Sequence, residues 1–147
     1  MANQPGGLQT DIEALPARLR LAIVRTARRL RQEAGSQLGP AQASALATIE
    51  RYGPLAPSEL AEREQIKRPT ATRILGSLEA AGLLTRVRDP EDGRSSILSV
   101  TAEGRELIRR TRARKTAYLA KRMRELPAED LRALERAAEL LEGMAGR

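Results

Sequence analysis

The sequence predicts a mainly α-helical fold with one small β-hairpin. The core has to be aliphatic, because the chain contains no Phe or Trp and only two Tyr, while hydrophobic residues make up 41% of it. Leu, Ile, Val, Ala and Met pack readily along helix faces. Apolar residues recur every three or four positions through most of the chain, as they do on one face of a helix. An Asp-Gly turn between two β-prone runs adds the hairpin.

The first helix is expected to follow a disordered tail. Residues 1–9 are small, polar and rich in Gly and Pro, a composition that favours disorder. Thr10 or Asp11 can cap a helix that extends to about Ala34, and Gly35 is suited to end it. One face of this helix is apolar, whereas the opposite face is rich in Arg. The apolar face comprises Ile12, Leu15, Leu19, Ile23 and Leu30.

Three shorter helices follow, each bounded by Pro or Gly. They are expected over residues 40–52, 58–64 and 68–81. A short extended piece around Leu55 lies between the first two. The second and third are separated only by the tight connection Gln65-Ile66-Lys67, and Gly82 is the natural residue to end the third.

A β-hairpin is expected next. Residues 83–88 and 97–100 are β-prone, and the DPEDGRS run between them combines Asp-Pro and Asp-Gly turn signals. Two short helices, a tight turn and then a hairpin are together typical of a winged helix-turn-helix. In that arrangement the exposed face of the second helix fits the major groove of DNA, and the hairpin, or wing, reaches the neighbouring minor groove or backbone.

The C-terminal third predicts two further helices and a dimer. Thr101 caps a helix that runs to about Arg124, Leu126-Pro127 interrupts it, and a last helix covers about 128–144. Apolar faces at both ends of the chain could bury against their own monomer. Since the central helices already supply a core, these faces instead favour a dimer interface. The expected interface residues are Ile12, Leu15, Leu19, Ile23, Leu131, Leu134, Ala138 and Leu141.

The chain is therefore expected to comprise a tail (1–9), a helical dimerisation region (10–36 and 102–147) and a winged helix-turn-helix (37–101). The exposed start of the second motif helix offers cations and hydroxyls, and the positive end of the helix dipole adds to the attraction for phosphate. The residues concerned are Lys67, Arg68, Pro69, Thr70, Thr72 and Arg73. The hairpin adds Arg94 at its tip, with Arg86 and Arg88 on the approach strand.

The charge of the chain points to the same class of partner. A formal net charge of +7, carried almost entirely by Arg, fits a phosphate-rich ligand. Charge alone also fits RNA or an anionic membrane, but the near absence of aromatic residues to stack on bases disfavours RNA.

Several classes of chemistry are disfavoured by composition. The chain contains no Cys or His, so it lacks thiolate and imidazole metal ligands and the usual general base. It also shows no nucleophile elbow and no Gly-rich phosphate loop. We therefore expect no metal, no cofactor and no enzymatic activity. Because no apolar run has the length of a membrane span or the form of a signal peptide, we expect a cytoplasmic protein without a membrane partner.

The stretch from Leu55 to Arg105 resembles the MarR family of bacterial winged helix-turn-helix transcription regulators. The resemblance rests on the runs GPLAPSELAE, KRPTATRILGSLEAAGLLTR and DPEDGRSSILSVTAEGR and on their mutual spacing. The Asp-x-Arg wing signature falls on Asp92 and Arg94. The order of one long helix, the motif and two C-terminal helices resembles the family over nearly the whole chain.

The resemblance implies a homodimeric repressor on a palindromic site in double-stranded DNA, released by a small effector. It places Pro69, Thr70, Thr72 and Arg73 towards DNA, with Lys67 and Arg68 at the helix start and Arg94 in the minor groove. Asp92 would position a wing Arg, since phosphates repel a carboxylate. The effector pocket would lie between the dimer frame and the DNA-binding lobe, built from the first, second and fifth helices. Aliphatic walls edged by Arg would suit an anionic, partly apolar ligand such as an aromatic carboxylate.

Three helix starts depart from the family pattern. Gly39, Ala56 and Lys67 stand where Ser or Thr is usual. Replacing a capping hydroxyl by Ala typically costs about 0.5–2 kcal/mol. Ser58 or Glu59 is expected to compensate at Ala56, whereas Lys67 cannot accept an N–H bond and puts a cation beside the groove.

The fifth helix carries much of the positive charge. Between Arg105 and Arg124 it has nine cations, and only Glu103 and Glu106 oppose them, whereas solvated helices usually mix their signs. Three interpretations remain open: a longer phosphate footprint beside the wing, an anion-binding cavity, or a plain solvated surface.

The main alternative to a sequence-specific regulator is a non-specific architectural protein whose arginines hold the nucleic-acid backbone alone. Thr70 and Thr72 argue against it, because hydrogen-bonding groups add nothing to binding by charge. The plainer interpretation of each feature also stands, since cations on an exposed helix or at a turn are often merely solvated.

Overall fold

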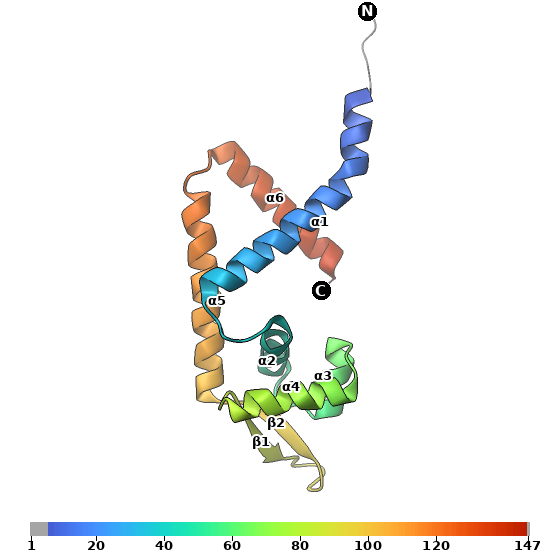
Figure 1. Cartoon of the computed structure of the whole chain (residues 1–147), viewed down its shortest axis with the longest axis vertical. Coiled ribbons are helices and arrows are strands. Elements are labelled where there is room, and N and C mark those ends of the chain that lie inside the picture. Colours follow the sequence, from blue (N-terminus) through green and yellow to red (C-terminus); the bar gives the residue numbers. More distant parts are fainter. Residues whose placement is uncertain (1–5, 147) are drawn as a thin grey trace, which may run out of the picture.

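The computed structural model describes residues 6–146, and the side chains from residue 12 onwards. In this part of the chain the elements are α1 (Gly6–Ala34), α2 (Pro40–Tyr52), α3 (Pro57–Glu64), α4 (Arg68–Ala80), β1 (Leu84–Arg88), β2 (Ser96–Val100), α5 (Ala102–Met123) and α6 (Ala128–Ala145). The molecule is elongated: α5 runs along one side and joins a lobe of α2, α3, α4 and the hairpin to α1 and α6 at the other end (Figure 1). The mainly helical fold with one hairpin is as predicted.

The start of α1 differs from the prediction. The helix begins at Gly6 rather than at Thr10 or Asp11, so residues 6–9 are helical although they were assigned to a disordered tail. Residues 1–5 lie outside the described part of the chain. Once a helix is nucleated, each added residue gains a backbone hydrogen bond, and Leu8 and Gln9 have good helix propensities. A polar residue that can cap a helix therefore need not be its first residue.

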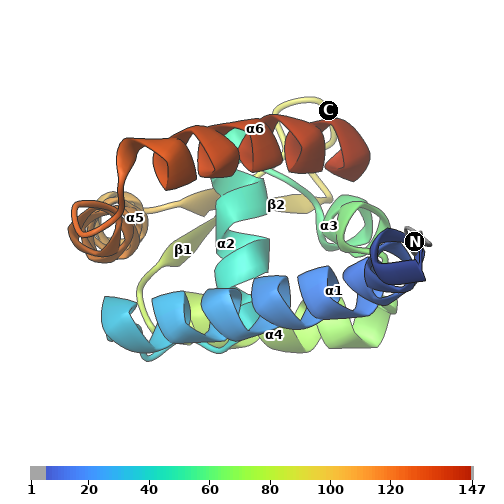
Figure 2. The same ribbon diagram turned by 90° about the horizontal axis from the view of Figure 1, so that it is seen from above.

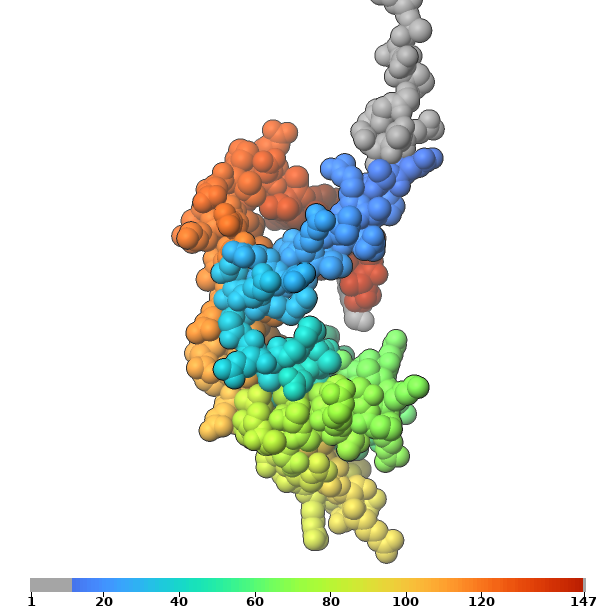
Figure 3. All heavy atoms as spheres, in the orientation of Figure 1, coloured from blue at the N-terminus to red at the C-terminus, as the bar shows by residue number. Residues whose placement is uncertain are grey.

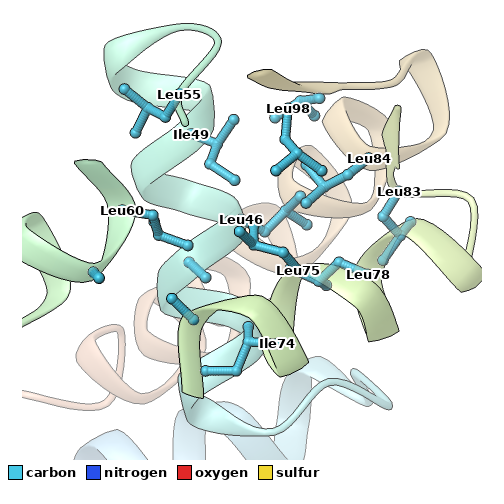
Figure 4. Packing of buried hydrophobic residues seen from close by; sticks show 14 of the residues in the cluster. Leu46, Ile49, Leu55, Leu60, Ile74, Leu75, Leu78, Leu83, Leu84 and Leu98 are labelled. Atoms are coloured by element: carbon cyan, nitrogen blue, oxygen red, sulfur yellow. The ribbon is translucent and has the colours of Figure 1, made fainter. Parts of the chain in front are cut away.

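The core lies in the lobe, where side chains from α2, α3, α4 and the hairpin converge (Figure 4). Its fully buried large residues are Leu46, Ile49, Leu60, Leu75, Leu78 and Leu98. The cluster extends into the first turns of α5 through Ile108. The hydrophobic core therefore crosses the expected boundary after residue 101, and the start of α5 is part of the lobe's packing.

The hairpin is antiparallel, with Leu84 opposite Val100 and Arg88 opposite Ser96. The extended piece expected around Leu55 pairs with β2: Leu55 N–H donates to the Leu98 carbonyl at 3.0 Å, and Leu98 N–H donates back at 2.8 Å. The connection between α2 and α3 thus adds a short third rung to the sheet and fixes the wing to the helical part of the lobe.

The start of α5 packs tightly on the hairpin. Thr101 caps the helix as predicted: its Oγ1 accepts the Gly104 N–H at 3.0 Å and donates to the Gly82 carbonyl at 2.7 Å. A Cβ atom on Gly104 would overlap the Leu83 carbonyl oxygen and would lie 2.8 Å from Val100 Cγ1. The absence of a side chain at Gly104 therefore lets the frame helix lie directly on the wing's base.

The frame is open in the single chain. From above, α1 and α6 run on opposite sides, with α2 of the lobe seen between them (Figure 2). α1 packs along α5, whereas α6 buries none of its described side chains. No helix in the described part of the chain is both long and apolar enough to cross a membrane.

Candidate nucleic-acid interface

One face of α4 is available at the surface of the lobe. Ala71, Ile74, Leu75 and Leu78 point into the core. The opposite face, at spacings of three and four residues, is exposed and comprises Arg68, Pro69, Thr72, Arg73 and Gly76. Lys67 is exposed just before the helix, whereas Thr70 is half-buried. The sequence thus identified a continuous exposed surface, with Thr70 at its edge.

The turn between α3 and α4 sets the direction of this surface. Gln65 adopts a left-handed conformation, with φ 53° and ψ 43°, and its N–H donates to the Glu62 carbonyl at 3.2 Å. Ile66 N–H donates to the Ala61 carbonyl at 3.0 Å. A non-glycine residue is strained in this region. No sequence signal marks the strain, because a Gln in a turn carries no conformational preference of this kind.

The first turn of α4 has no side-chain cap. Lys67 has an extended backbone and makes no capping bond, as its chemistry predicts. Thr72 Oγ1 donates to the Arg68 carbonyl at 3.0 Å, which leaves its oxygen lone pairs facing outward. Orphan backbone N–H groups at a helix start bind anions well. This end of α4 therefore combines free N–H donors with the cationic Lys67 and Arg68.

The other two missing caps are partly replaced from within their helices. Glu59 Oε2 accepts the Ala56 N–H at 2.9 Å, so Glu59 rather than Ser58 supports α3. Gln42 Oε1 accepts the Gly39 N–H at 3.2 Å, and its Nε2 donates to Ser77 Oγ at 2.8 Å. Gln42 therefore supports the start of α2 and also links that helix to α4.

Glu64 at the end of α3 fixes the angle between the motif helices. Its carboxylate accepts hydrogen bonds from Ser44 Oγ at 2.6 Å and from the Thr48 hydroxyl, both on α2. Bonds to a charged acceptor are stronger than neutral ones. α3, and through the short turn α4, are thereby held in one orientation on α2.

The wing tip projects furthest from the frame, at the opposite end of the molecule (Figure 3). Asp92 shapes it: Oδ1 accepts the Arg94 backbone N–H at 3.1 Å, and Oδ2 accepts the Ser95 hydroxyl at 3.0 Å. Arg94 itself is exposed. The carboxylate therefore orders the backbone that carries Arg94, and the Arg94 side chain is left at the surface.

The two strand arginines are placed differently. Arg88 is exposed, but Arg86 makes a paired contact with Glu79 at the end of α4, Nε to Oε2 at 3.2 Å and Nη2 to Oε1 at 3.3 Å. Arg86 was expected to approach DNA. In this structure its guanidinium instead ties β1 to α4, which fixes the wing relative to the exposed helix face.

Several arginines of α5 have partners inside the protein. Arg105 Nη1 donates to the Val100 carbonyl at 2.9 Å, and Arg114 Nη1 donates to the Ala34 carbonyl at the end of α1 at 3.0 Å. Arg112 pairs with Glu50 of α2 at 3.0 Å. These contacts join the frame to the lobe. The sequence missed them because the acceptors are carbonyls and a carboxylate on other elements.

Arg109 is occupied within its own helix. Its Nη2 lies 2.6 Å from Glu106 Oε1. The hydrogen bond from Arg109 lowers the pKa of Glu106, and the same bond raises the pKa of Arg109. Of the three interpretations of the α5 charge, internal support accounts for part of the set, and the phosphate footprint is left with fewer free cations.

A cavity lies between the frame and the lobe, where the effector pocket was expected. Its volume is about 370 Å³, and Leu38, Leu83 and Leu107 line it together with Arg110 and Arg114. The walls come from the end of α1, the α1–α2 connection, the end of α4 and α5. α2 borders instead a neighbouring cavity of about 90 Å³ that shares Leu38 and Leu107. The combination of aliphatic walls and Arg edges is as predicted.

The residues expected at a dimer interface lie largely at the surface of the single chain. Ile12 is 64% exposed and Leu134 is 45% exposed. Leu15, Ile23 and Ala138 are also exposed, whereas Leu19, Leu131 and Leu141 are half-buried. Among the described residues, no cluster of Asp and Glu side chains could hold a metal ion.

Comparisons with known proteins agree with the geometry. The model of the MarR family matches residues 38–96. An HTH-type transcriptional regulator of Mycobacterium tuberculosis is 35% identical over 128 residues, which cover 86% of this chain and 90% of that protein. The crystal structure of a Pseudomonas aeruginosa protein is 31% identical and covers 99% of both chains, with a TM-score of 0.82. MepR of S. aureus, crystallised with an oligodeoxyribonucleotide, is 16% identical and shares the fold over 90% of this chain and 98% of its own, with a TM-score of 0.69.

Proposed function

Since this chain belongs to the MarR family of DNA-binding, HTH-type transcription regulators, we propose that it acts as a homodimeric repressor on an inverted repeat. Each α4 would enter a major groove, and each wing would reach the adjacent minor groove. The observation that carries this proposal is the exposed, uncapped and cationic start of α4 beside a wing whose Arg94 is at the surface.

The reading surface would consist of two parts. Pro69, Thr70, Thr72 and Arg73, with Lys67 and Arg68 at the helix start, would contact base edges and phosphates. Arg94 would enter the minor groove, and Asp92 would act by ordering the wing backbone. Arg88 could add a backbone contact, and Arg86 would do so only after leaving Glu79. Arginine forks match guanine edges, and hydroxyls bond bases or phosphates, so both chemistries needed for a specific site are present.

The apolar faces of α1 and α6 support the dimer. Residues such as Ile12, Leu15, Leu134 and Leu140 are half exposed or more, and exposed apolar faces of this extent favour a partner surface. α6 gains no burial from its own chain. A second copy with its frame against this one would cover both helices, and a two-fold dimer matches a two-fold operator.

The cavity of about 370 Å³ between frame and lobe supports an effector. Leu38 and Leu107 would contact the apolar part of an anionic ligand, and Arg110 would bind its carboxylate. A ligand at this junction would change the separation of the two α4 helices. Affinity for DNA would then fall, because both half-sites could no longer be contacted together.

Footprinting with purified protein tests the proposal. The full chain should protect a short inverted repeat whose half-site centres lie about 34–36 Å apart, one turn of the double helix. An Arg73→Ala variant should lose affinity by about 1–3 kcal/mol. Arg28→Ala, which removes the same charge from the exposed polar side of α1, is the matched control and should bind as wild type.

Two outcomes would contradict the proposal. Equal protection of any duplex, with a steep salt dependence, would indicate the non-specific architectural protein instead. Protection of a single half-site by a monomer, shown by the mass of the complex in solution, would remove the dimer.

A further inference from the structure

A second cavity lies on the frame, between α1 and the C-terminal half of α5. It is open to solvent and has a volume of about 690 Å³. This part of α5 is the end remote from α4 and the wing (Figure 1). Pockets that bind small organic ligands typically have volumes of about 300–1,000 Å³. The cavity is therefore large enough for a ligand and lies outside the DNA interface.

Its lining is cationic. Arg29 comes from α1, and Arg114, Lys121 and Arg122 come from α5, against the two carboxylates of Glu33 and Glu125. Glu33 is already paired with Arg29 at 2.6 Å, and Arg114 donates to a backbone carbonyl. The lining thus keeps an excess of two positive charges over its carboxylates.

Tyr118 lies at the centre of these cations. The guanidinium carbons of Arg29 and Arg122 are 5.7 Å and 5.5 Å from the centre of its ring, so one aromatic side chain is held by cations from two different helices. Cations gathered around one ring repel each other, and an anion between them would relieve that repulsion. The ring and the stems of the arginines supply apolar surface beside the charges.

We propose that this cavity binds a small organic dianion with an apolar body. Its anionic groups would contact Arg29 and Arg122, and its body would lie against Tyr118. Planar guanidinium groups bind carboxylate or phosphate oxygens in a forked geometry. Two anionic groups match the excess of two cations. The site is distinct from the proposed effector cavity, which is lined by Leu107 and Arg110, since the two linings share only Arg114.

The protein offers a natural reporter. It contains two Tyr and no Trp, so a Tyr52→Phe variant leaves Tyr118 as the only tyrosine. Hydrogen bonding to Arg122, and then to Arg29, lowers the pKa of Tyr118 from 10.0. An anion that occupies these guanidinium groups should raise the pKa of Tyr118 again.

The test titrates the full-length Tyr52→Phe chain with cyclohexane-1,3-dicarboxylate, which has no near-ultraviolet absorbance. At a fixed alkaline pH the tyrosinate absorbance should fall in a saturable way. The monoanion cyclohexanecarboxylate should act at least about tenfold more weakly, since it lacks one charge-assisted contact. A response that does not saturate, or equal responses to both compounds, would overturn the proposal.

Calorimetry of the same titration locates the site without using the reporter. Arg122→Gln should weaken binding of the dicarboxylate about tenfold or more, because it removes one guanidinium contact. Arg110→Gln removes the same charge from α5 but lines only the other cavity, so it should leave binding unchanged. The reverse pattern would place the dianion in the cavity between frame and lobe and would overturn the proposal.

Discussion

Replacing Gly104 by Ala should destabilise the chain, although Ala is the better helix former. A Cβ at this position would overlap the Leu83 carbonyl oxygen and lie 2.8 Å from Val100 Cγ1. The first neighbour is backbone, so it cannot move aside without disturbing the end of α4 and the start of β1. Overpacking of this kind costs about 1–3 kcal/mol, and two close contacts put Gly104→Ala near the upper value. The gain in helix propensity returns about 1 kcal/mol.

The expected net loss is about 2 kcal/mol in the free energy of unfolding. Urea denaturation followed by circular dichroism measures it, at one fixed protein concentration because a dimer's stability depends on concentration. Gly76→Ala in α4 is the matched control: no atom outside its helix lies within 4 Å of the added Cβ. This variant should be more stable by about 0.5–1 kcal/mol. If Gly104→Ala were as stable as Gly76→Ala, the tight contact between α5 and the wing's base would not exist.

Three further predictions test the turn, the wing and the α5 surface. Gln65→Gly should raise the free energy of unfolding by up to about 1 kcal/mol in urea denaturation, because a left-handed non-glycine residue costs about 1–2 kcal/mol and the mobility of Gly in the unfolded chain offsets part of that. No gain would argue against the φ of 53°. Asp92→Ala should weaken DNA binding in a gel-shift titration without lowering stability by more than about 1–2 kcal/mol, since it removes two exposed hydrogen bonds at the wing tip. Asp92→Asn, which keeps an acceptor, should bind more nearly as wild type, and tight binding by the Ala variant would refute the role. Glu106 should titrate below 4.5 in NMR of its side-chain carboxyl, because the bond from Arg109 lowers its pKa. The stability that this carboxylate contributes is present above pH 4.5 and is lost as the pH falls through the lowered pKa. In Arg109→Gln the titration should return towards the ordinary value, and an unchanged titration would refute the cause.

Local signals predicted most of the fold. Pro57 at the start of α3, Gly82 after α4 and Thr101 before α5 each act within a few residues of their own position, through a fixed φ, a positive φ or a side-chain cap. The exposed face of α4 could also be read from helical spacing, because Ala71 and Leu78 mark the opposite, buried side.

Contacts between elements distant in the sequence could not be predicted. Arg86 looked like a free wing cation until the fold brought Glu79 beside it. Arg114 looked like part of a cationic surface, and only the packing of α1 on α5 gives it the Ala34 carbonyl as a partner. A charge carries no mark of its partner in the sequence, so the number of free arginines was overestimated.

The preferred DNA sequence of each variant tests the central claim, that the start of α4 reads the operator. Wild type, Arg73→Ala and Arg110→Ala would each select binding sites from a random duplex pool. Arg73→Ala should select an altered half-site, because a base contact is lost. Arg110→Ala should select the wild-type half-site. An unchanged half-site for Arg73→Ala, or an altered one for Arg110→Ala, would contradict the assignment of α4 as the reading helix.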